Sequence, residues 1–129
     1  MYITQVSVFV ENKFGRLSEI LNELSENNIN IRALSMADTS EFGILRMIVD
    51  DTEKAKQVLN ESGVIVKTSP VIAIDIDDTP GCLAKIVEKL KNAGVSIEYT
   101  YAFLGRDHNS AKVVLRVDDT EKSESVLRA

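Results

Sequence analysis

The chain has 129 residues, 44% hydrophobic and 27% charged, a composition that fits a folded domain and argues against intrinsic disorder. A net charge of −5 argues against nucleic acid or an anionic membrane as partner, and a single cysteine excludes an intramolecular disulfide framework. No apolar run reaches the roughly 20 residues that span a bilayer, and we find no signal peptide, so we expect a cytoplasmic protein.

An internal repeat organises the rest of the sequence. Phe14-Gly15-Arg16-Leu17 aligns with Pro80-Gly81-Cys82-Leu83, and Asp50-Asp51-Thr52-Glu53-Lys54 recurs unchanged as Asp118-Asp119-Thr120-Glu121-Lys122. Between these markers the apolar residues keep matching spacings in the two copies. An identical run of five residues, combined with this shared periodicity, predicts a duplicated unit.

The first copy predicts alternating strands and helices. Val6, Val8 and Val10 alternate with other residues, which is typical of a strand with one buried face, and the leucines from Leu17 to Leu24 follow helical spacing. In chain order we expect a strand over 3–10, a helix over 17–24, strands over 29–37 and 44–49, a helix capped by Asp50-Asp51-Thr52, and a strand over 64–66.

The second copy predicts the same elements without the last one. We expect a strand over 71–77, a helix with Thr79 as N-cap and Pro80 in its first position, strands over 95–104 and 111–117, and a helix from about Thr120. Ser69-Pro70 is the whole junction between the copies. The order is that of the ferredoxin-like βαββαβ unit. We therefore predict an α+β fold with two such units, residues 1–68 and 69–129, the second lacking its last strand.

The predicted core collects the apolar faces of these elements. It comprises Val6, Val8, Leu17, Leu21, Leu24, Ile48 and Leu59 in the first copy, and Ile74, Ile76, Leu83, Val87, Leu90, Val113 or Val114, and Leu127 in the second.

The missing strand leaves an edge to be covered. In the ferredoxin-like order the fourth strand lies beside the first, so the strand over 71–77 would lose its outer neighbour. Proteins usually cover a long apolar edge. Three arrangements could cover this edge. The strand could pair with the same strand of a second molecule, or with a strand from the first copy or from an enzyme partner. The third is that the natural chain is longer than this one. We expect the first of these, a two-fold homodimer.

The sequence offers little for catalysis. His108 is the only histidine and has no nearby cysteine or histidine with which to bind a metal, and Cys82 has no base within its own element. Phosphate-binding and nucleophile-elbow motifs are absent from the sequence, and helix capping accounts for two of the aspartate pairs. We expect no enzyme, no metal site and no cofactor.

The two strand-to-helix loops are the candidate ligand site. Each has a glycine, Gly15 or Gly81, three residues after a polar residue, Asn12 or Asp78. A helix N-terminus presents backbone N–H groups that suit a carboxylate, and the polar residue suits an ammonium or hydroxyl group. The alternative is a tight connection with an ordinary N-cap.

These loops and their surroundings resemble the ACT domain. Both copies carry a strand, then (Glu/Asp)-(Asn/Asp)-x-(Phe/Pro)-Gly-x-Leu, an amphipathic helix and (Asn/Ser)-Ile, so the resemblance covers the chain except for one C-terminal strand. It implies a small regulatory module that binds amino acids at interfaces between paired ACT domains. The ligand-binding residues expected are Asn12, Phe14, Gly15, Arg16, Leu17, Asn30 and Ile31 in the first copy, and Asp78, Pro80, Gly81, Cys82, Leu83, Ser96 and Ile97 in the second.

Three functions follow from this resemblance. The leading one is a tandem ACT protein that binds a small amino acid and signals to a partner, with no catalysis of its own. The second is the regulatory subunit of a branched-chain biosynthetic enzyme, because residues 11–17 resemble the opening of the acetohydroxyacid synthase regulatory subunit. The third is an interaction module whose pockets have decayed.

Overall fold

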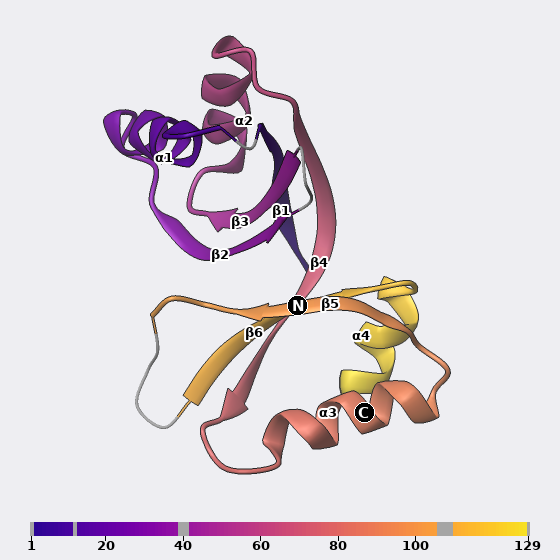
Figure 1. Ribbon diagram of the computed structural model, residues 1–129. Helices are drawn as coiled ribbons and strands as arrows, with labels where there is room; N and C mark the ends of the chain where they lie inside the picture. Colours follow the sequence, from indigo (N-terminus) through magenta and orange to yellow (C-terminus); the bar gives the residue numbers. More distant parts are fainter. Residues whose placement is uncertain (1, 12, 39–41, 106–109, 129) are drawn as a thin grey trace. The chain divides into compact units, whose positions relative to one another are not determined.

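The computed structural model describes residues 2–11, 13–38, 42–105 and 110–128, over which it has six strands and four helices (Figure 1). The elements are β1 (Tyr2–Glu11), α1 (Arg16–Glu26), β2 (Ile31–Asp38), β3 (Phe42–Val49), α2 (Thr52–Glu61), β4 (Val66–Asp77), α3 (Cys82–Asn92), β5 (Ile97–Ala102), β6 (Ser110–Val117) and α4 (Thr120–Arg128). Asn12 and His108 lie outside the described residues.

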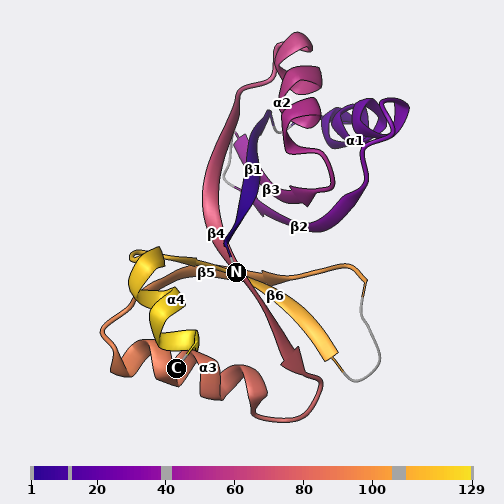
Figure 2. The ribbon, with the colours of Figure 1, turned by 180° about the vertical axis from the view of Figure 1, so that it is seen from behind.

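The chain divides into two compact units. The N-terminal unit comprises residues 4–69, and the C-terminal unit combines residues 2–3 with residues 70–128. Hydrogen-bonded strands follow the order β2-β3-β1-β4 in the first unit and β4-β6-β5 in the second. In each unit the two helices pack together on one face of the sheet (Figures 1 and 2). The α+β fold with two ferredoxin-like units, the second lacking its last strand, is therefore confirmed.

β4 differs from the prediction because it is one strand where two were expected. The segments over 64–66 and 71–77 belong to a single run of twelve residues, Val66–Asp77, that continues through Ser69 and Pro70. Proline lacks one backbone donor, but its fixed φ is compatible with extended backbone, so the strand can continue. The carbonyl of Pro70 also accepts a hydrogen bond from Arg116 Nη1 at 2.8 Å.

The start of β1 belongs to the C-terminal unit. Tyr2 and Ile3 group with residues 70–128, and β1 is a hydrogen-bonded neighbour of β4. Ile3 lines a hollow together with Ala73, Ile74 and Asp75 of β4. Three alternatives for covering the edge of the strand over 71–77 followed from the sequence. The structure has the one in which a strand from the first copy lies beside β4. A bare β4 edge is no longer a reason to expect a homodimer.

Each unit has its own apolar core. Val6, Val8 and Val10 are buried as predicted, and they pack with Ile20 and Leu24 of α1 in the N-terminal unit. Buried residues of the C-terminal core are Ile72, Ile74, Leu90, Val95, Val113, Leu115 and Val117.

Several predicted core residues lie outside these clusters. Leu17 is 36% exposed and Val87 37% exposed, so their placement in the core was wrong. Leu21 is half-buried and absent from the cluster. An apolar stripe on a helix is wider than the strip that contacts a sheet, so residues at its flank and in its first turn remain accessible. Ile48 and Val114 are buried, but they belong to neither cluster.

The second aspartate of each repeated pair caps a helix, as predicted. Asp51 Oδ1 accepts a hydrogen bond from the backbone N–H of Lys54 at 3.1 Å, and Asp119 Oδ1 accepts one from Lys122 at 3.0 Å. Each bond satisfies one backbone donor in the first turn of α2 or α4.

Truncating Leu24 should destabilise the protein far more than truncating Leu17. Leu24 is fully buried between α1 and the sheet, so Leu24→Ala is expected to cost about 2–5 kcal/mol through lost burial and a residual cavity. The matched Leu17→Ala change should cost less than about 1 kcal/mol. Urea unfolding of both variants measures the difference, and equal losses would contradict this description of α1.

Candidate functional site

The two candidate loops have the same backbone structure. Gly15 and Gly81 are the N-cap residues of α1 and α3, with φ of 79° and 89°, in the left-handed region that glycine adopts without strain. Neither helix has a side-chain cap at this position. In each loop the residue two before the glycine donates its N–H over a short turn, at 2.8 Å in both cases.

Thr79 is not the N-cap of α3, contrary to the prediction. The left-handed turn at Gly81 makes Cys82 the first helical residue, and Pro80 precedes the helix. Thr79 Oγ1 instead lies 2.8 Å from Cys82 Sγ, where either group can donate. The carbonyl of Thr79 accepts a longer bond from the Cys82 N–H at 3.4 Å.

Hydrogen bonds inside the loops reduce the number of backbone N–H groups that can donate to a ligand carboxylate. The N–H of Arg16 donates to the carbonyl of Lys13 at 3.2 Å, as that of Cys82 does to Thr79. Both N–H groups were expected to face the ligand. They are engaged inside the loops, so the neighbouring N–H groups of the first helical turn are the better candidates.

The side chains of the two loops differ in charge. In the N-terminal unit Lys13 Nζ lies 2.8 Å from Glu11 Oε2, and this hydrogen bond lowers the pKa of the Glu11 carboxyl. Arg16 pairs with Glu19 at the same distance. The loop of the C-terminal unit has Asp78 and Pro80, both exposed, and no cation of its own. Phe14 is fully exposed, while Cys82 and Leu83 are half-buried.

The predicted residues of the second strand lie where β2 and β5 begin. Asn30 precedes Ile31, the first residue of β2, and Ser96 precedes Ile97, the first residue of β5. Asp50 Oδ1 accepts a hydrogen bond from the Asn30 N–H at 3.0 Å, and the Asp50 N–H donates to the Asn30 carbonyl at 3.1 Å.

The same pair of bonds occurs in the C-terminal unit. Asp118 Oδ1 accepts from the Ser96 N–H at 3.0 Å, and the Asp118 N–H donates to the Ser96 carbonyl at 3.1 Å. Sequence reasoning assigned the repeated aspartates to capping alone and therefore missed this bond of the first aspartate in each pair. The exact recurrence of the pair in both copies was the available signal.

Two hollows occupy equivalent places beside these strand starts. The hollow of the N-terminal unit measures 540 Å³ and is lined by Leu21, Leu24, Ser25, Asn28, Ile29, Asn30, Ile31 and Asp50. The hollow of the C-terminal unit measures 420 Å³ and is lined by Val87, Lys91, Gly94, Val95, Ser96 and Ile97. Each unit thus presents its predicted strand residues at a concave surface.

Within one unit, the loop and the strand start lie at opposite ends of a helix. α1 has 11 residues, and at about 1.5 Å per residue it separates its two ends by about 16 Å. The structure therefore does not bring Gly15 together with Asn30, or Gly81 with Ser96, inside a single unit. A site that uses both sets of residues requires a second, apposed unit.

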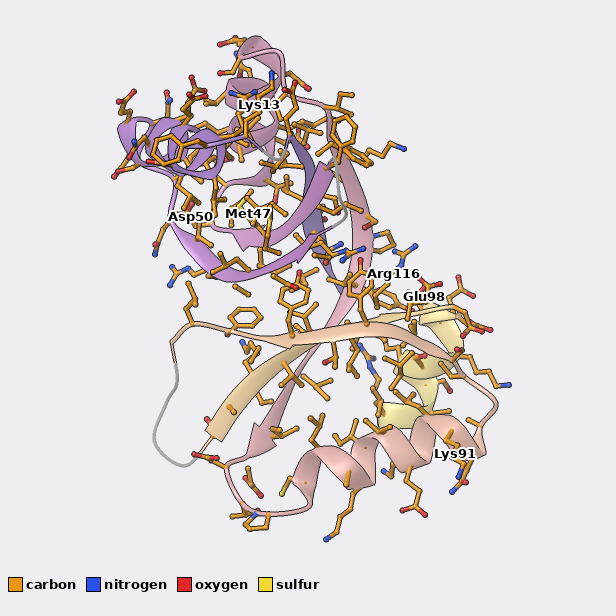
Figure 3. All side chains as sticks on the ribbon, in the orientation of Figure 1. Lys13, Met47, Asp50, Lys91, Glu98 and Arg116 are labelled. Carbon is orange, nitrogen blue, oxygen red and sulfur yellow. The ribbon has the colours of Figure 1, made fainter. Side chains whose placement is uncertain are left out.

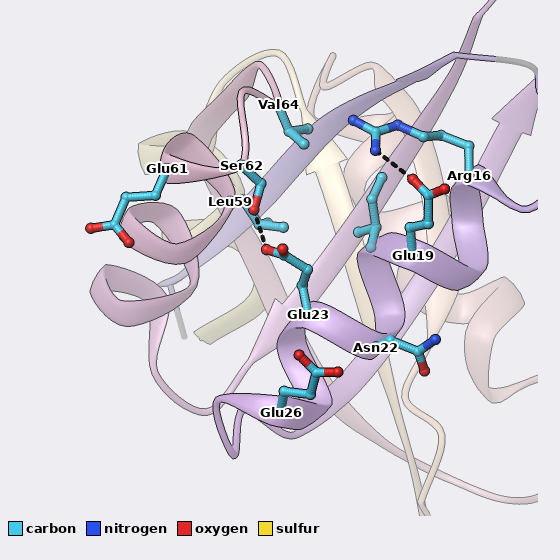
Figure 4. Close-up of a pocket in the computed structure, with 10 residues that line it drawn as sticks. Arg16, Glu19, Asn22, Glu23, Glu26, Leu59, Glu61, Ser62 and Val64 are labelled. Carbon is cyan, nitrogen blue, oxygen red and sulfur yellow. Dashed lines mark hydrogen bonds and ion pairs between the residues drawn. The ribbon is translucent and has the colours of Figure 1, made fainter.

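A third hollow was not foreseen from the sequence. It lies between α1 and α2, measures 610 Å³ and is lined by Arg16, Glu19, Ile20, Asn22, Glu23, Glu26, Leu59, Glu61, Ser62 and Val64. Figure 4 shows Glu23 turned toward Ser62, whose hydroxyl donates to its carboxylate, and Arg16 turned toward Glu19. The spacing of the glutamates along α1 could have indicated this surface.

The described part of the chain contains no cluster of three or more histidine, cysteine, aspartate or glutamate residues that could hold a metal ion. None of its helices is long and apolar enough to cross a membrane.

Comparison with known proteins identifies the family and the fold. A family model described as an ACT domain pair matches residues 1–129. The structure of protein BT0572 from Bacteroides thetaiotaomicron is 41% identical, with a TM-score of 0.93 over 99% of this chain and 88% of that one. The comparison with curated proteins gives no match.

More distant structures share the fold. The regulatory subunit of aspartate kinase from Thermus thermophilus is 16% identical, with a TM-score of 0.72 over 99% of this chain and 91% of that one. The corresponding subunit from Thermus flavus is 17% identical, with a TM-score of 0.68 over 99% and 92% of the two chains.

Alanine at either loop glycine should destabilise the protein without a steric clash. A Cβ at Gly15 or Gly81 would meet no atom within 4 Å, so the cost comes from the left-handed backbone alone, about 1 kcal/mol for each substitution. Gly63→Ala is the matched control, because Gly63 has a φ of 80° and equally open surroundings. Urea unfolding should give similar losses for the three variants. A Gly15→Ala variant as stable as the wild type would contradict the loop conformation.

Proposed function

Because the chain belongs to the ACT domain pair family, we propose that it is a non-catalytic regulatory module that binds a small amino acid where two ACT units meet and signals to a partner enzyme. The observation that carries the proposal is the repeated loop, with Gly15 and Gly81 in the same left-handed N-cap conformation. A duplicated loop with open space around its glycine suits close approach by a small ligand.

The proposed site combines two kinds of group. The ligand carboxylate binds backbone N–H groups at the start of α1 or α3, and Asn12 or Asp78 binds the ligand ammonium. Asn30 and Ile31, or Ser96 and Ile97, come from the apposed unit. The two sites are not equivalent, because Asp78 carries a charge that attracts an ammonium group and Asn12 does not.

The proposed partner is a biosynthetic enzyme in the cytoplasm. Structures that share this fold include regulatory subunits of aspartate kinase, which supports a role in controlling an enzyme of amino-acid metabolism. A second candidate is the regulatory subunit of a branched-chain biosynthetic enzyme, favoured by the resemblance of residues 11–17 to the acetohydroxyacid synthase subunit. Co-purification with a large catalytic subunit identifies the enzyme.

We also propose that the protein is a homodimer paired through an edge strand. Among the described residues, β2 and β5 each have one hydrogen-bonded neighbour strand, so their outer edges can accept a strand from a second copy. ACT modules commonly pair sheet to sheet, and such pairing supplies the apposed unit that the proposed site needs.

A screen of the twenty common L-amino acids tests the binding function. A ligand that binds only the folded state raises the melting temperature, and calorimetry then gives its dissociation constant. Asp78→Ala is expected to weaken binding about 10- to 150-fold, since a hydrogen bond to a charged group contributes about 1.5–3 kcal/mol. Asn12→Ala should have a smaller effect.

The matched control is Glu88→Gln, which removes one negative charge from an exposed position on α3. It should leave the affinity unchanged. Equal affinity in the wild type, Asn12→Ala and Asp78→Ala would show that the site lies elsewhere. If no amino acid raises the melting temperature, the third function remains, which is an interaction module without a ligand.

Light scattering at micromolar concentration tests the dimer. The wild type should have twice the mass of one chain. Met36→Lys in β2 and Ala102→Lys in β5 each place a lysine on an exposed position of an edge strand, a device that blocks strand pairing. The variant that becomes monomeric identifies the pairing edge, and a monomeric wild type would refute the homodimer.

A further inference from the structure

The repeated aspartate pairs contain a residue that capping does not explain. The second member of each pair caps the helix that follows it. The first member, Asp50 or Asp118, bonds back to a residue 20 or 22 positions earlier in the chain, at the start of β2 or β5. The two copies differ in the length of chain between the bonded residues, yet both keep the bonds.

Each of these aspartates forms two hydrogen bonds with the backbone of its partner residue. Both the N–H and the carbonyl of Asn30 are bonded to Asp50, and both those of Ser96 are bonded to Asp118, at 3.0 and 3.1 Å in each copy. Two bonds to one residue fix the direction of its backbone and therefore the direction in which its side chain leaves the strand.

The carboxylate acts where the strand ladder is irregular. The register of β2 with β3 shifts between Ile31 and Ala33, and that of β5 with β6 shifts between Ile97 and Tyr99. Next to such a shift, regular pairing with the neighbouring strand is interrupted. The aspartate carboxylate accepts the hydrogen bond of the Asn30 or Ser96 N–H. It therefore orders the start of the strand more than strand pairing alone would.

This arrangement makes the side chain of Asn30 or Ser96 available to a ligand, and not its backbone. The backbone polar groups of Asn30 and Ser96 are already paired. The Asn30 carboxamide and the Ser96 hydroxyl are exposed, each at the lining of a hollow, and neither has a hydrogen-bond partner in the residues that the structure describes. Asp50 lines the same hollow as Asn30, at the end of β3 (Figure 3).

We propose that Asp50 and Asp118 are positioning residues of the amino-acid site. Each fixes a strand start, so that the backbone and the Cα–Cβ direction of Asn30 or Ser96 are set before the ligand arrives. A backbone that is ordered in advance loses less conformational freedom on binding, and the affinity is correspondingly higher. This inference rests on the proposed function, since it concerns the residues that meet the ligand.

Calorimetry on the full chain tests this role, with the L-amino acid that raises the wild-type melting temperature most as the probe. Asp50→Ala should weaken binding about tenfold, comparable to losing one hydrogen bond. Asp50→Asn keeps an Oδ1 acceptor for the Asn30 N–H and should restore most of the affinity. Asp51→Ala is the matched control: it removes a capping bond of 3.1 Å in the same turn but does not touch Asn30.

A double-mutant cycle separates positioning from general destabilisation. Asp50 bonds to the backbone of Asn30, so the bonds survive in Asn30→Ala while the ligand-binding carboxamide is gone. In that background Asp50→Ala should have no further effect on affinity. The same cycle with Asp118 and Ser96 tests the other site.

The outcomes test the positioning role separately from the proposed amino-acid binding. Wild-type binding with an unchanged Asp50→Ala affinity would overturn the positioning role and leave the function intact. A loss that persists in the Asn30→Ala background, or that Asp51→Ala reproduces, would also overturn it. A wild type that binds no amino acid would refute both.

Discussion

Both units depend on β4, because the residues of this one strand are divided between them. Its first residues, from Val66, complete the order β2-β3-β1-β4, and its remaining residues to Asp77 begin the order β4-β6-β5. β1 is shared in the same way, since Tyr2 and Ile3 belong to the C-terminal unit. A chain cut between residues 68 and 69 would leave the N-terminal unit almost complete but would take Tyr2 and Ile3 from the C-terminal unit. The C-terminal unit therefore depends on the start of the first copy as well as on β4.

Duplication has kept the backbone of the loops while their side chains have diverged. The left-handed glycine and the short turn before it recur in both copies with matching bond lengths. The N-terminal loop pairs Lys13 with Glu11, whereas the C-terminal loop has Asp78 and a thiol in contact with Thr79. Backbone geometry sets where a small ligand can approach, and the side chains decide which ligand is favoured. One frame can thus carry two sites of different chemistry.

The bonds from Asp50 and Asp118 connect the fold to the proposed site. A ladder irregularity at a strand start would ordinarily be a weak point, and here a carboxylate from the following strand end holds it. The same bonds occupy the backbone groups of Asn30 and Ser96. In the proposed function, the two aspartates therefore order both the strand starts and the residues that meet the ligand.

The sequence by itself determined what local periodicity and short-range chemistry encode. The alternation of Val6, Val8 and Val10 predicted a strand, the recurring leucines predicted α1, and the repeat predicted a duplicated βαββαβ order, because these patterns act over a few residues. The tertiary structure decided the rest: Gly81 and not Thr79 caps α3, β4 continues through Pro70, and Leu17 remains exposed. Likewise, the placement of Tyr2 and Ile3 with the C-terminal unit and the bond from Asp50 to Asn30 join residues far apart in the chain. Such pairings depend on which strands meet in the folded sheet, and no local pattern of residues specifies that.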